Sequence, residues 1–123
     1  MKYFKFTINR RDYKLAIDDI LFIQVSKEKI HMVKVVTTDK EYHIYHQLKD
    51  IEREYHQFLR CHRDTLVNRD TIRIMDREQR LLYVGDEKRP VHYARSKGSQ
   101  LKEIISNDWF LEEIYVRYLC TRG

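Results

Sequence analysis

The apolar residues of this chain recur in short runs with a two-residue period, and this spacing constrains the fold more than any other feature. In residues 2–8, Phe4, Phe6 and Ile8 alternate with more polar neighbours, as in a strand with one buried face. Residues 20–25 form a nearly continuous apolar run that is short enough for a buried strand. Further strand candidates are residues 12–16, 31–38 and 41–45.

The period then changes to that of a helix. Leu48, Ile51, Tyr55 and Phe58 recur at helical spacing, so an amphipathic helix is predicted over Gln47–His56. Two apolar runs then flank the polar residues 76–79, and they predict a hairpin that pairs Ile72 and Ile74 with Leu81 and Tyr83.

The last third of the chain predicts one more strand and a terminal helix. Residues 88–92 form the short strand, and Pro90 suits the edge of a sheet better than its centre. A polar, partly helical segment over residues 95–105 leads to an amphipathic helix over about 108–119, for which Asn107 or Asp108 could be the cap. Its apolar stripe consists of Leu111, Ile114, Tyr115, Tyr118 and Leu119.

Together these patterns predict a mainly β fold with about eight or nine short strands and two or three helices. A parallel α/β fold is disfavoured because the helices do not alternate with the strands. With 123 residues, of which 42% are hydrophobic and 35% charged, the chain is expected to form one domain over 1–123. There is no signal peptide in residues 1–10 and no apolar run of membrane-spanning length. The two cysteines suggest no disulfide framework, so a cytoplasmic protein without a membrane partner is expected.

The basic residues fall into three segments, and the net charge of +5 favours an anionic partner. Arginine can bind a phosphate or the edge of guanine with two hydrogen bonds, and asparagine can do the same for adenine. The densest segment lies between Phe58 and Ile72, where apolar residues are interspersed with these donors. The first basic segment contains Lys27, Lys29 and His31; the second contains Arg60, His62, Arg63, Asn68 and Arg69; the third contains Arg95, Lys97 and Ser99. They can form one binding surface only if the fold brings them to one face.

Metal binding and catalysis are not expected. None of the six histidines has a spacing typical of a zinc site. Cys61 and His62 are adjacent, so on an extended segment their side chains point to opposite faces and cannot form a catalytic dyad. The chain contains no glycine-rich phosphate loop and no nucleophile elbow. We therefore expect a protein that is not an enzyme and has no cofactor.

Four stretches resemble the LytTR-type DNA-binding domain of bacterial transcription regulators, over about residues 14–105. They are I-D-D-I-L-F-I-Q at Ile17–Gln24, Y-H-I-Y-H-Q-L-K-D-I-E at Tyr42–Glu52, F-L-R-C-H-R-D-T-L-V-N at Phe58–Asn68 and I-R-I-M-D-R at Ile72–Arg77. The third, with its Arg-x-His-Arg…Val-Asn signature, is the most specific. The resemblance implies a β-sandwich of short antiparallel sheets whose loops enter successive major grooves of a bent duplex. It also implies paired direct repeats upstream of promoters, bound by two protein copies or a homodimer.

The resemblance assigns roles to residues by position. His31, or Ile30 one position away, falls at the first base-contacting loop, and His62 and Arg63 fall at the second. Asn68 ends the motif and suits a brace for the loop. In the third loop the family has Ser-Arg where this chain has H-Y-A-R-S-K at residues 92–97, so Arg95 is the first candidate and Lys97 the second. Most relatives carry an N-terminal receiver domain, and such a domain or another regulatory partner would lie outside these 123 residues.

Two other functions remain open at this point. The terminal helix or the exposed tyrosines could bind another protein, which would make this an interaction module. The nine tyrosines could also stack on single-stranded RNA bases, although most of them occupy positions predicted to be core.

Overall fold

The computed structural model describes residues 2–108; residue 1 and residues 109–123 lie outside the described part. Ten strands and a short α-helix precede residue 95: β1 (Tyr3–Ile8), β2 (Arg11–Ala16), β3 (Ile20–Val25), β4 (Met32–Thr37), β5 (Glu41–Tyr45), α1 (Leu48–Glu54), β6 (Phe58–His62), β7 (Thr65–Asn68), β8 (Ile72–Asp76), β9 (Leu81–Val84) and β10 (Pro90–His92). Three 3-10 turns complete these elements: η1 (Ile17–Asp19), η2 (Arg69–Thr71) and η3 (Arg95–Lys97). Residues 98–108 are helical.

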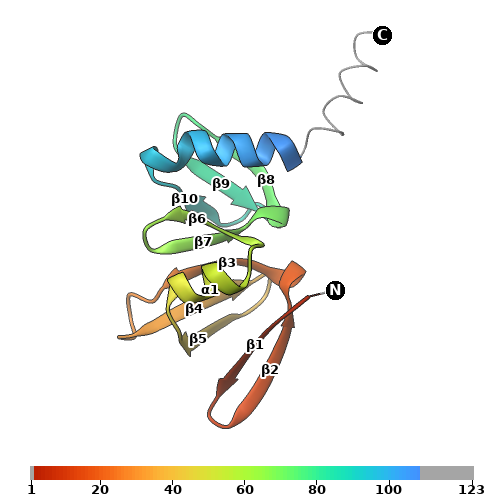
Figure 1. Cartoon of the computed structure of the whole chain (residues 1–123), viewed down its shortest axis with the longest axis vertical. Coiled ribbons are helices and arrows are strands. Elements are labelled where there is room, and N and C mark those ends of the chain that lie inside the picture. Colours follow the sequence, from red (N-terminus) through yellow and green to blue (C-terminus); the bar gives the residue numbers. More distant parts are fainter. Residues whose placement is uncertain (1, 109–123) are drawn as a thin grey trace.

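The strands form three antiparallel sheets. A central five-stranded sheet has the order β5-β4-β3-β7-β6, a three-stranded sheet has the order β10-β9-β8, and β1 and β2 form a separate hairpin. In Figure 1 the central sheet lies between the β1–β2 hairpin and the layer made by β8, β9, β10 and the helical residues 98–108. The prediction of a mainly β, antiparallel fold is therefore confirmed.

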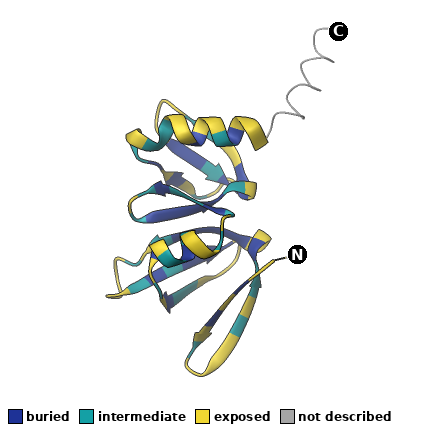
Figure 2. Ribbon diagram, in the orientation of Figure 1, coloured by how far each residue is buried: buried dark blue, intermediate teal, exposed yellow. Residues whose placement is uncertain are grey.

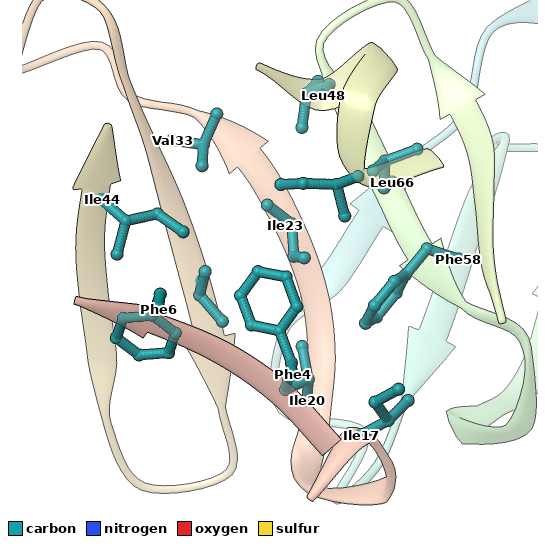
Figure 3. Packing of buried hydrophobic residues seen from close by; sticks show 12 residues of the cluster. Phe4, Phe6, Ile17, Ile20, Ile23, Val33, Ile44, Leu48, Phe58 and Leu66 are labelled. Atoms are coloured by element: carbon teal, nitrogen blue, oxygen red, sulfur yellow. The ribbon is translucent and has the colours of Figure 1, made fainter. Parts of the chain in front are cut away.

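The central sheet separates two hydrophobic clusters. On one face Ile23 and Leu66 pack with residues of β1 and α1, including Phe4 and Ile51. Figure 3 shows Phe4 pointing into this cluster beside Ile20. The Phe4 and Phe58 rings meet edge to face, with their centroids 6.3 Å apart.

The second cluster lies on the other face of the same strands. Phe22 and Val67, the neighbours of Ile23 and Leu66 in sequence, pack there with Leu82 and Leu101. Consecutive residues of β3 and β7 are thus buried on opposite faces, because side chains alternate along a strand. This double burial, visible as dark blue central strands in Figure 2, accounts for the continuous apolar run at residues 20–25. Each fully buried side chain of this size contributes about 1.5–3 kcal/mol to stability.

Several elements differ from their predicted limits. The helix predicted over Gln47–His56 is shorter, and Phe58 belongs to strand β6 instead of the helical face. Tyr55 already has an extended backbone after the last turn of α1, so the helical spacing of Phe58 is coincidental. The prediction that Pro90 lies at a sheet edge is confirmed, because β10 is an outer strand.

The segment before the predicted terminal helix is helical, as expected for residues 95–105. Residues 98–108 are already helical, so Asn107 and Asp108 lie within the helix and do not cap its start. Leu101 and Ile105, one helical turn apart, are 2% and 3% exposed, and their burial against the second cluster stabilises the helix over residues 98–108. The predicted apolar stripe, Leu111 to Leu119, lies outside the described residues.

Candidate nucleic-acid interface

Parts of all three basic segments lie along one edge of the molecule. The β3–β4 loop (residues 26–31), the β6–β7 turn (residues 63–64) and the link from β10 into η3 (residues 93–97) follow one another up the left side of Figure 1. We refer to these three stretches together as the basic edge. They are far apart in sequence, so their proximity is a product of strand pairing.

Backbone hydrogen bonds tether the three stretches to one another. The N–H of Val25, at the base of the β3–β4 loop, donates to the carbonyl of Asp64 in the β6–β7 turn at 2.9 Å. The N–H of Ala94 donates to the carbonyl of Cys61 on β6 at 2.8 Å. The β6–β7 hairpin therefore holds the β3–β4 loop on one side and residues 93–97 on the other. The strands thus set the distances between the three stretches.

The β3–β4 loop is internally ordered. The hydroxyl of Ser26 accepts from the N–H groups of Glu28 and Lys29 at 3.3 and 3.0 Å. The N–H of Ser26 donates to the carbonyl of Met32 at 3.0 Å and closes the loop. Lys27, Lys29 and His31 are all exposed, so this loop presents its donors to solvent on a fixed backbone.

The second basic segment is a hairpin with a two-residue turn rather than a loop. His62 pairs with Thr65, so only Arg63 and Asp64 form the turn. Arg63 is exposed there. Arg60 lies on β6, where its Nε donates to Glu52 at 3.2 Å and its Nη1 donates to the Arg63 carbonyl. Arg60 thus braces the turn against α1.

Asp64 in this turn lies beside His62, the last residue of β6. The Nδ1 of His62 lies 2.6 Å from Oδ1 of Asp64, and the hydroxyl of Thr65 donates to the same oxygen at 2.9 Å. Burial by itself raises the pKa of the Asp64 carboxyl, but the Thr65 hydrogen bond and the His62 ring together outweigh it, so this pKa lies below its usual value. The carboxylate therefore stays charged at neutral pH and holds His62 beside Arg63.

Asn68 and Arg69, both predicted site residues, lie far from the β6–β7 turn. Asn68 is fully buried, and its Nδ2 donates to the carbonyls of Ile17 and Ile20 at 2.9 and 2.8 Å. Arg69 follows β7 at the end opposite to the turn, where it binds both carboxylate oxygens of Asp108 at 3.0 and 2.8 Å. Asn68 is the last residue of the four-residue strand β7 and Arg69 follows it, so the strand places both far from Arg63, a separation that a segment interpreted as one loop does not predict.

Two surface hollows connect the three stretches. His31 from the first and Arg63 from the second line one hollow, together with Arg60. Arg60 also lines a second hollow with Lys97 of the third stretch. Arg60 is therefore shared by two hollows, one that contains His31 and Arg63 and one that contains Lys97.

Sequence reasoning missed several cations on this surface. Arg77 and Arg80, in the β8–β9 turn, share a hollow with Arg95 and Lys102. That turn was interpreted only as a polar hairpin connection, although its two arginines were the available signal. His46 and Lys49, at the start of α1, likewise line the hollow that contains His31.

Within residues 2–108 the structure contains no group of three or more His, Cys, Asp or Glu side chains placed to hold a metal ion. The same part of the chain includes no helix that is long and apolar enough to cross a membrane. Cys61 is buried in the second cluster, whereas His62 is half-buried at the surface. Burial raises the pKa of the Cys61 thiol to about 12.

This burial predicts an unreactive thiol. In a Cys120→Ser variant, alkylation of Cys61 by iodoacetamide at pH 8 should be roughly a thousandfold slower in the folded protein than in guanidinium, because the thiolate fraction is lower by about that factor. The measurement is the alkylation rate followed by mass spectrometry. Equal rates in the two states would show that Cys61 is accessible and ionised in the fold.

Comparisons with known proteins agree with this architecture. The model of the LytTr DNA-binding domain family matches residues 10–106. Accessory gene regulator protein A of Staphylococcus aureus, from strains N315 and MW2, is 32% identical over 66 residues, which cover 54% of this chain but only 27% of that regulator. The LytTr DNA-binding domain of a Bacillus cereus protein assigned as a methyl-accepting/DNA response regulator superimposes with a TM-score of 0.68 at 16% identity. It covers 85% of this chain and 97% of that domain, and at this identity it shows likeness of fold.

Proposed function

The chain belongs to the LytTR DNA-binding domain family, and from this premise we propose that it binds specific sequences in double-stranded DNA and thereby regulates transcription, without catalysing a reaction. The single observation that carries the proposal is the tethering of three cationic stretches along one edge. A rigid row of donors suits a duplex, whose grooves recur along one side.

Base contacts are proposed for one exposed side chain in each stretch of the basic edge. These are His31, Arg63 and Arg95, with Lys97 as the second candidate in the third stretch. Arg63 stands at the tip of a hairpin, where a guanidinium can enter a major groove and bind guanine with two hydrogen bonds. His62, whose ring lies beside the Asp64 carboxylate, is the second candidate for a base contact in this stretch. We propose that the three stretches enter successive major grooves and that two copies bind direct repeats upstream of promoters.

Phosphate contacts are proposed for the cations around the three base-contacting residues. Lys27 and Lys29 flank the first position, and Arg77, Arg80 and Lys102 surround Arg95. Contacts to phosphate position a protein and supply salt-sensitive affinity, whereas contacts to base edges supply selectivity. Arg60 and Asn68 support the edge from behind, and Arg69 binds Asp108 away from it.

We further propose that residues 1–123 act as a single domain in the cytoplasm. The matching segment makes up only 27% of the relative's length, and we propose that a receiver domain or another regulatory partner acts together with residues 1–123.

The function is tested by selecting genomic DNA fragments that bind the purified protein and sequencing them. We expect enrichment of a short motif, repeated in the same direction at a constant spacing. Labelled fragments should be displaced by unlabelled motif DNA and not by single-stranded RNA. Retention of random duplex without any enriched motif, or displacement by RNA, would contradict the proposal.

The β8–β9 turn offers a separate prediction on phosphate contacts. Replacing Arg77 and Arg80 together by alanine should weaken binding to all duplexes by a similar factor. The salt slope, which is the slope of the logarithm of the binding constant against the logarithm of the salt concentration, should fall in magnitude by about two, since each phosphate contact contributes about one. The matched control replaces Arg10 and Arg11 of the β1–β2 hairpin, which are exposed at the far end of the molecule in Figure 1. An unchanged slope in the first variant would place the β8–β9 turn outside the footprint.

A further inference from the structure

The β3–β4 loop carries an exposed apolar side chain among its cations. Ile30 is 80% exposed, the highest value among the large hydrophobic residues that the structure describes. Its neighbours are Lys29 and His31, both exposed. Removing a large apolar side chain from water is favourable, so an apolar partner that covers Ile30 would gain binding free energy.

The loop holds this side chain outward on a fixed backbone. Hydrogen bonds to the Ser26 hydroxyl order its first half, and the N–H of Met32 donates to the carbonyl of Lys29 at 3.4 Å across Ile30. His31 has a positive φ of 65°, a left-handed conformation that reverses the chain directly after Ile30. Isoleucine is also stiff at χ1, so fixing it against a partner costs little side-chain entropy.

The duplex offers one apolar group in the major groove, the C5-methyl of thymine. The surroundings of Ile30 suit that groove, because its neighbour His31 shares a hollow with Arg63 at the tip of the next hairpin. A side chain flanked by donors for phosphate and base edges would reach base pairs with its apolar end.

We propose that Ile30 is a specificity-determining residue that packs against the C5-methyl of one thymine and so selects an A·T pair beside the pair contacted by His31. This inference rests on the proposed DNA binding and deepens it. It assigns to the first stretch a second, apolar contact that does not depend on charge.

The test removes single methyl groups from the DNA. Each thymine of a selected single-repeat site is replaced in turn by deoxyuridine, and the Kd is measured for the parent protein and for Ile30→Ala. For the parent protein, one position should weaken binding about three- to fivefold, the factor expected for one buried methyl group. For Ile30→Ala, binding to the thymine site should weaken by at least as much, and deoxyuridine at that position should have no further effect.

Two controls separate this contact from other roles. Ile74→Ala, on β8 and 44% exposed, should retain the full deoxyuridine effect. Ile30→Ala should keep the parent's thermal midpoint and salt slope, since the side chain is neither buried nor charged.

Each alternative outcome has a distinct meaning. If no deoxyuridine effect disappears in Ile30→Ala while the parent still selects a motif, this inference fails and the proposed function stands. If Ile30→Ala weakens binding only on two-repeat DNA, the inference is overturned in favour of a contact between protein copies. If the parent selects no motif, the proposed function fails and the inference fails with it.

Discussion

Replacing Asn68 by aspartate is expected to lower the free energy of unfolding by about 3–5 kcal/mol at neutral pH. The side chain is fully buried, and its Nδ2 donates to two main-chain carbonyls, those of Ile17 and Ile20. A carboxylate would direct a negative oxygen at both carbonyls and leave them unsatisfied. Its Oδ1 partners, the N–H of Asp70 and Nε2 of Gln57, would be retained. Chemical denaturation at pH 7 measures the loss.

The loss should depend on pH in a known direction. Burial raises the pKa of the new carboxyl above its value in the unfolded chain, so the folded variant binds more protons than the unfolded one. The loss of unfolding free energy in this variant should therefore shrink as the pH falls toward about 4, near the pKa of the carboxyl in the unfolded chain. Asn9→Asp, in the exposed β1–β2 turn, is the matched control and should change stability by less than about 0.5 kcal/mol. A deficit below 1 kcal/mol for Asn68→Asp would contradict the bracing role.

Replacing Arg63 by alanine is expected to cost about 1–3 kcal/mol of binding free energy on the selected site, which is about 5- to 150-fold in Kd. The guanidinium stands exposed in a two-residue turn, and the contacts that order this turn do not involve it. The Arg60 Nη1 binds the carbonyl of residue 63, which alanine also has. The variant should thus keep its stability and lose selectivity at one base pair. Titration of selected and random duplexes measures both effects.

Arg63→Lys separates charge from shape. Lysine keeps the positive charge but lacks the planar fork that binds guanine with two hydrogen bonds, so its salt slope should match the parent's while selectivity falls. Arg73→Ala is the control, because Arg73 is exposed on β8 and donates to the carbonyl of Asp70 in η2, away from the basic edge. Equal weakening of all duplexes by Arg63→Ala would show that Arg63 contacts phosphate and not a base.

Much of the fold could be predicted because periodicity reports how each element is buried. The continuous run at residues 20–25 predicted a buried strand, and β3 is buried on both faces for that reason. The same logic was wrong where two periods overlapped. Phe58 has a helical spacing from Ile51 and Tyr55, yet it begins strand β6, since spacing alone does not record where a helix ends.

The candidate site was less predictable, because composition does not distinguish a donor that faces solvent from one that supports the chain. The second basic segment contains Arg63 together with Arg60, Asn68 and Arg69. The last three are each hydrogen-bonded to other parts of the protein. Arg77 and Arg80 were missed because the sequence of a polar hairpin turn does not show which other cations the fold places beside it.

The sequence by itself determined the alternating strands, the family motif at residues 58–68 and the three basic segments, because these depend on residues close together in the chain. The tertiary structure alone decided which cations meet. The proximity of His31, Arg63 and Lys97 depends on pairing between Gln24 and Thr65 and on the hydrogen bond from Ala94 to Cys61. Such contacts join residues more than thirty positions apart, and their geometry follows from the packing of two clusters against one central sheet.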